Sequence, residues 1–63
     1  MSAEQLRRLE AINRYAKFFP YYIAPINYAE FAILNDEERN ICLANAEKRI
    51  RNLQVQIENY LKN

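Results

Sequence analysis

Apolar residues recur at alternating steps of three and four along the C-terminal half of the chain. The series is Leu43, Ala46, Ile50, Leu53, Ile57 and Tyr60, and Cys42 and Leu61 widen it. This period places them on one face of an α-helix, with a stripe wide enough for packing against other helices. Asn35 followed by Glu38 is a capping pattern, and neither proline nor glycine follows it. The pattern predicts a helix from Asp36 to about Lys62.

The N-terminal segment carries a second apolar face at helical spacing. It consists of Leu6, Leu9, Ile12, Ala16 and Phe19. Ser2 with Gln5 forms a capping pattern at its start, and Pro20 prevents the helix from continuing. Asn13, at the edge of the face, is expected to set the register of packing. We expect this helix to pack antiparallel on the long one.

The segment between them, residues 18–31 (FFPYYIAPINYAEF), holds six of the eight aromatic residues and both prolines. Residues 20–26 are predicted to form an extended or turn-like connector, because two prolines restrict it. Asn27 with Glu30 then predicts a short helix to about Leu34, with Phe31 joining Ile33 or Leu34 against the long helix. The sequence thus predicts an all-α fold, an elongated helical hairpin of three helices with a short middle helix, forming a single domain over residues 1–63.

The length of the predicted C-terminal helix, compared with the size of so short a chain, indicates self-association. A helix of 27 residues is about 40 Å long, whereas a compact chain of this length would have a diameter of roughly 27 Å. Chains this short usually need a disulfide, a metal or a partner, and Cys42 is the only cysteine, with no histidine present. The long helix is acidic in its first half and basic in its second, so two copies laid antiparallel would match acid to base. The predicted dimer interface lies opposite the main stripe and comprises Ile41, Ala44, Glu47, Lys48 and Val55.

The residue types argue against catalysis. Cys42 lies on the apolar stripe with no histidine to activate it, so we expect a buried structural thiol. Asp36, Glu37 and Glu38 are consecutive helix positions whose side chains diverge, and negative charge is favoured on a first helical turn. We therefore predict no enzymatic activity, no metal and no cofactor. The N-terminus lacks the apolar core of a signal peptide, and no uninterrupted apolar run is long enough to span a bilayer, which predicts a cytoplasmic protein without a membrane segment.

The remaining signal is the aromatic connector. Tyr15 and Phe18 are expected to point sideways or outwards, because they lie about 100° or more from the apolar face of the first helix. Tyr21 and Tyr22 are adjacent within the proline-bounded segment, so we do not expect both to be buried. Tyrosine suits a protein interface, and these four residues are the predicted contacts with a partner. The sequence predicts a non-enzymatic protein-binding module: an adaptor, an inhibitor or a phage-type antagonist of a host protein. The alternative is a small nucleic-acid-binding protein whose tyrosines stack on bases, although a net charge of +1 and helix ion pairs such as Glu4 with Arg8 argue against it. Its basic residues would be Arg7, Arg14, Lys48, Arg49 and Arg51.

Overall fold

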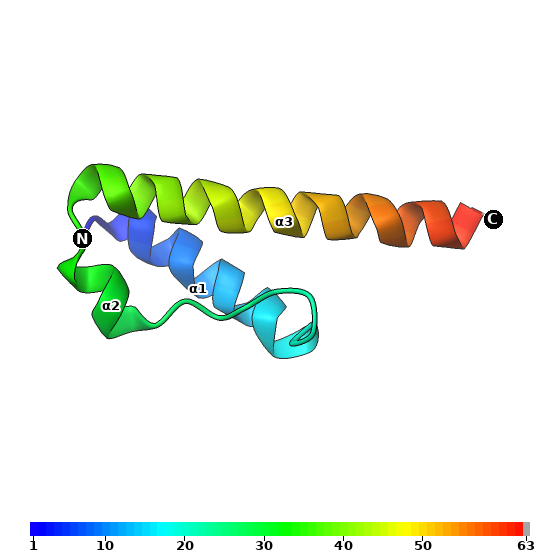
Figure 1. Cartoon of the computed structure of the whole chain (residues 1–63), viewed down its shortest axis with the longest axis horizontal. Helices are drawn as coiled ribbons and strands as arrows, with labels where there is room; N and C mark the ends of the chain where they lie inside the picture. Colours follow the sequence, from blue (N-terminus) through cyan, green and yellow to red (C-terminus); the bar gives the residue numbers. More distant parts are fainter. Residues whose placement is uncertain (63) are drawn as a thin grey trace.

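A computed structural model describes residues 1–62 and contains three helices, α1 (Ala3–Phe18), α2 (Tyr28–Ile33) and α3 (Asp36–Lys62) (Figure 1). No strand occurs in these residues, so the all-α prediction, with a short middle helix and a long C-terminal helix, is confirmed. The molecule measures 43 × 19 × 16 Å, and its Cα radius of gyration is 12.8 Å. A compact chain of this length would have a radius near 11 Å. The elongation comes from α3, whose length of about 40 Å accounts for the long axis.

Polar caps set the helix starts where the sequence predicted them. The Ser2 hydroxyl accepts from the Gln5 N–H at 3.1 Å, and the Gln5 side chain accepts from the Ser2 N–H at 3.0 Å. The same reciprocal pair joins Asn35 and Glu38 at 2.8 and 3.0 Å. At α2, Asn27 accepts from the backbone N–H three residues on, at 3.0 Å. Each cap satisfies backbone N–H groups that would otherwise lack a partner within the helix.

The direction of α1 relative to α3 differs from the prediction. Contacts pair Gln5 with Asp36, Arg8 with Glu47 and Tyr15 with Gln54, so both helices run the same way. Figure 1 shows the chain turning after α1 and returning along it before α3 begins. The predicted antiparallel packing was wrong because the chain reverses at residues 19–23, where the Tyr22 and Ile23 N–H groups donate to the Phe19 carbonyl, and then returns along α1 before α3 begins. Residues 24–27 reach about 13 Å if extended, and the six residues of α2 add about 9 Å, which together nearly retrace the roughly 24 Å length of α1.

Asn13 holds the returning connector in place. Its side-chain nitrogen donates to the Ile26 carbonyl at 3.0 Å, and its side-chain oxygen accepts from the Ile26 N–H at 2.8 Å. The side-chain amide thus pairs with both the backbone N–H and the backbone carbonyl of Ile26. The sequence placed Asn13 at a helix–helix seam, whereas the structure shows that it fixes the connector on α1.

All three helices and the connector contribute to the core. Its buried members are Leu9, Ile12 and Ala16 of α1, Ile23 of the connector, Phe31 of α2, and Leu43, Ala46, Ile50 and Leu53 of α3. Ile33 is exposed, and Leu34 is the α2-flanking residue that packs on the core with Phe31. Cys42 is only partly buried at the edge of the core, which corrects the expectation of a buried thiol. The predicted stripe on α3 therefore becomes core only as far as Leu53.

A polar network joins the starts of α1 and α3. The buried Gln5 amide donates to Asp36 at 2.8 Å and to Asn40 at 3.1 Å. Arg39 donates to the Gln5 side-chain oxygen at 3.2 Å and to the backbone carbonyls of Ala32 and Leu34 near the end of α2. The network ties all three helices together at one end of the molecule.

Candidate functional site

The two ends of the molecule differ in how much of α3 is covered. At the closed end, the N-terminus of α1, the helix α2 and the start of α3 meet (Figure 1). At the other end, α1 stops while α3 continues beyond it. Residues 11–26 and 48–62 are called the open end below. Every residue from 54 to 62 is exposed. The last turns of α3 therefore extend past the part that α1 and the connector can cover.

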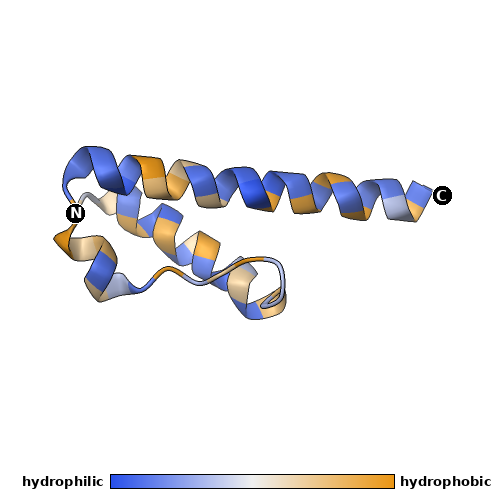
Figure 2. Ribbon diagram, viewed as in Figure 1, coloured by the Kyte–Doolittle hydropathy of each residue, from blue (hydrophilic) through white to orange (hydrophobic). Residues whose placement is uncertain are grey.

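The apolar stripe of α3 nevertheless continues along this uncovered stretch. Ile57 is 37% exposed, Tyr60 82% and Leu61 77%, although the spacing of these residues matches that of the core. Hydrophobic residues recur along α3 as far as its C-terminal end (Figure 2). The sequence left open whether this part of the stripe packs within the chain or against a second copy. The structure leaves Ile57, Tyr60 and Leu61 exposed, because α1 has 16 residues against 27 in α3. That mismatch in length is a sequence signal that these residues are available for contact.

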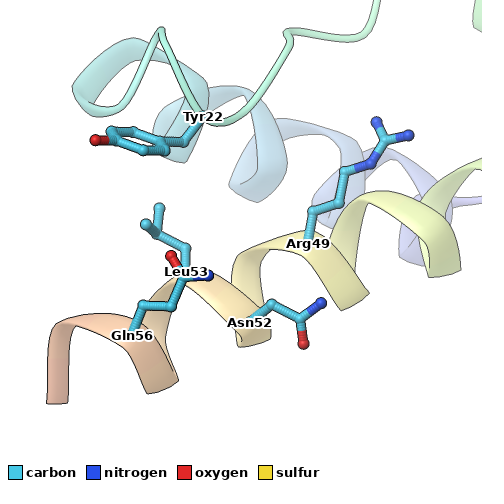
Figure 3. A pocket seen from close by; sticks show the side chains of 5 residues that line it. All are labelled: Tyr22, Arg49, Asn52, Leu53 and Gln56. Carbon is cyan, nitrogen blue, oxygen red and sulfur yellow. The ribbon is translucent and has the colours of Figure 1, made fainter. Parts of the chain in front are cut away.

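A hollow lies between the connector and this part of α3, and it is called the wedge below. Its volume is about 230 Å³, and its lining residues are Phe19, Tyr22, Leu53, Gln56, Ile57 and Tyr60. A second hollow of about 190 Å³ adjoins it and shares Tyr22, Leu53 and Gln56. Figure 3 shows the Tyr22 ring facing Leu53 across this second hollow, with Arg49, Asn52 and Gln56 projecting from α3. None of the residues lining either hollow is acidic.

The four predicted partner-binding residues lie at the same open end. Phe18 is 74% exposed, Tyr21 95% and Tyr22 67%. Tyr15 is different, because it packs on the core, stacks with Phe19 at a ring-centroid distance of 6.4 Å and accepts a 2.7 Å hydrogen bond from Gln54. Phe18, Phe19 and Tyr15 also line an apolar hollow of about 270 Å³ on the α1 side. The structure thus places Tyr15 and Phe18 at one hollow and Tyr22 at another, with Phe19 lining both.

Charge separates along the same axis. The open end carries six basic residues and one acidic residue, a net side-chain charge of +5, whereas the rest of the chain carries three basic and seven acidic residues, a net of −4. The basic residues of the open end are Arg14, Lys17, Lys48, Arg49, Arg51 and Lys62, and its acid is Glu58. The parallel arrangement of α1 and α3 produces this polarity, since it places the basic halves of both helices side by side.

One ion pair crosses from α1 to α3 near the middle of the molecule. Arg8 donates to both Glu47 carboxylate oxygens, at 2.6 and 2.9 Å. Hydrogen bonding between the two side chains lowers the pKa of Glu47 and raises the pKa of Arg8. The carboxylate partner expected for Arg8 was Glu4, one turn away on the same helix, but the bidentate contact goes to Glu47.

The residues of the predicted dimer interface lie on the outer side of α3. Ile41 and Val55 are 54% and 53% exposed, and Ala44 and Lys48 are exposed as well. Glu47 has Arg8 of the same chain as its partner, which the prediction did not include. The interface itself stays a prediction.

The residues proposed for nucleic-acid binding divide between the two ends. Arg14, Lys48, Arg49 and Arg51 belong to the open end with the tyrosines, while Arg7 lies in the first half of α1. Arg49 borders the hollow beside Tyr22, and Arg51 lines another hollow with Tyr15 and Gln54. They flank the open end on different sides.

Residues 1–62 also lack two features that would indicate other classes of protein. These residues hold no group of three or more histidine, cysteine or carboxylate side chains placed to share a metal ion. No helix within them combines the length and hydrophobicity needed to cross a membrane. No protein-family model matches the chain, and no curated protein or solved structure matches it significantly.

Proposed function

We propose that this protein is a non-enzymatic binding module that contacts another protein through its open end. One end of the elongated molecule combines exposed aromatic side chains, an exposed apolar stripe and most of the positive charge, and this combination supports the proposal. Apolar surface of this kind contributes to association by being removed from water. Tyrosine and arginine are both enriched among residues that dominate binding energy.

The connector supports this role by being fixed before a partner arrives. Its backbone is held by Asn13 at Ile26 and by hydrogen bonds from the Tyr22 and Ile23 N–H groups to the Phe19 carbonyl, each 3.0 Å long. Ile23 is buried in the core, which anchors the segment between two exposed tyrosines and the second proline. A segment that is already ordered loses less conformational entropy on binding.

Capture from native lysate tests the proposal. The parent is compared with a Tyr21→Ala, Tyr22→Ala variant and with a Tyr28→Ala, Ile33→Ala control, which removes exposed apolar surface from the closed end. Each capture is done with and without nuclease. We expect protein partners that survive nuclease, disappear with the first variant and persist with the control. Partners that persist with the first variant would contradict the assignment of the open end.

Binding of single-stranded nucleic acid is a second candidate, because Arg49 borders the same hollow as the Tyr22 ring. Basic groups beside aromatic rings are typical of single-strand sites, and binding dominated by phosphate contacts weakens steeply with salt. Nucleic acid as the sole captured species, lost with added salt, would favour this function over protein binding.

A further inference from the structure

We propose that the wedge takes an acidic amphipathic helix of a partner protein. This inference rests on the proposed function, and it specifies the secondary structure and the charge of the segment that is bound. The occupant would lie between the connector and the last turns of α3, with its apolar side on Leu53, Ile57 and Tyr60.

The helical form follows from the spacing on α3. Leu53, which is buried, and Ile57 and Tyr60, which are exposed by 37% and 82%, belong to one stripe at steps of three and four. Such a stripe is the surface that packs against another helix. Because α1 ends at Phe18, no helix within residues 1–62 packs beside Ile57 and Tyr60. A groove of this kind binds an amphipathic helix through apolar side chains at matching intervals.

The acidic character follows from what surrounds the wedge. Both hollows are lined by apolar, amide and arginine side chains, with no carboxylate among them. The open end as a whole has a net side-chain charge of +5. A partner with glutamate or aspartate on its outward side would be attracted from a distance and oriented on arrival, whereas a basic one would be repelled.

A second copy of this chain fits the wedge less well. Two wedges facing each other would bring two ends of net charge +5 together. In the predicted antiparallel pair, which would match acid to base, the contact face is the outer side of α3 with Ile41, Ala44 and Val55. That face lies opposite the stripe of Leu53, Ile57 and Tyr60, so such a pair leaves the wedge uncovered. The wedge is therefore assigned to a different protein.

Synthetic peptides test the assignment directly. The probe is a fluorescent peptide of about 14 residues, roughly 21 Å long as a helix, with leucine at i, i+3, i+4 and i+7 and glutamate at the outward positions. One control has lysine in place of glutamate, and another has a central proline that interrupts the helix. Binding is followed by fluorescence anisotropy at low salt against the parent, Ile57→Asp, Tyr60→Ala and the closed-end control Ile33→Asp.

We expect the glutamate peptide to bind the parent and the Ile33→Asp protein alike. It should bind at least about tenfold more tightly than the lysine peptide, with a difference that shrinks as salt is added. Ile57→Asp and Tyr60→Ala should weaken binding by about tenfold or more. Both side chains are substantially exposed, so circular dichroism should show unchanged helicity.

Four results would overturn the inference. Equal binding of the lysine peptide would refute the acidic character, and equal binding of the proline peptide would refute the helical form. If the molecular mass of the parent in solution rose with concentration, and Ile57→Asp abolished this rise, the occupant of the wedge would be a second copy. Finally, the peptide could fail to bind while capture of protein partners from lysate still depended on Tyr21 and Tyr22. This result would refute the role of the wedge and leave the proposed function intact. If the peptide failed to bind and capture did not depend on the two tyrosines, both proposals would be refuted.

Discussion

Replacing Asn13 by alanine should release the connector from α1 and destabilise the whole chain. The substitution removes the two hydrogen bonds of 3.0 and 2.8 Å to Ile26 and leaves the N–H and the carbonyl of that residue without their side-chain partner. At about 1 kcal/mol for each bond, the loss is about 2 kcal/mol. A domain of this length is stable by about 3 to 9 kcal/mol, so the loss is a large fraction of the total.

The matched control is Asn52→Ala, which makes the same substitution at an exposed position within a helix. Both variants gain the same helix propensity, about 0.5 kcal/mol, so the difference between them isolates the contacts of Asn13. Urea unfolding followed by circular dichroism should show a midpoint about 2 M lower for Asn13→Ala than for the control if the slope is near 1 kcal/mol/M. Hydrogen exchange at Tyr22 and Ile23 should also accelerate. Midpoints that agree between the two variants would refute the role given to Asn13.

Three further results are expected. Leu53→Ala should lower the free energy of unfolding by about 2 kcal/mol, the low end for a core leucine, because Leu53 lies at the rim of the core. Ile57→Ala should lower it by under 1 kcal/mol. Equal losses in urea unfolding would mean that α3 is covered beyond residue 53. The ion pair that lowers the pKa of Glu47 stabilises the fold fully above pH 4.5, and this contribution is lost as pH falls through the lowered pKa. Glu47→Gln should therefore flatten the pH dependence of the urea midpoint at acid pH. An unchanged profile would argue against the ion pair. The predicted dimer should give twice the 7.6 kDa chain mass in light scattering, and Ile41→Asp should return it to a monomer; a parent that is monomeric at high micromolar concentration would contradict it.

The helices could be predicted from sequence because their signals are local. Capping pairs such as Ser2 with Gln5 fix where a helix begins, and the period of the apolar residues fixes which face is covered. The bounds of α3 follow directly from these two signals. The exposure of Phe18 also followed from its angle to the apolar face of α1, and that of Tyr21 from its place beside Tyr22 in a proline-bounded segment. The same angle did not predict that Tyr15 packs on the core.

The arrangement of the helices could not be predicted in the same way. Whether α3 runs parallel or antiparallel to α1 depends on the path of the connector, and that path is set by the contact of Asn13 with Ile26, thirteen residues later. The burial of Ile23 carries no periodic signal, because the residue lies in an irregular segment. The sequence shows the division of charge along α3, but only the parallel arrangement places the basic half of α1 beside the basic half of α3.

The central claim is that an acidic partner helix binds at the open end, and a map of amide chemical shifts tests it most directly. The ¹⁵N-labelled protein is titrated with the glutamate peptide, and shifts are recorded along residues 1–62. The account predicts changes concentrated at Phe19–Ile23 and Leu53–Leu61, with little change at Ile33 and Ile41. Changes centred on Ile33 and Ile41 at the opposite end, or no change at any residue, would contradict it.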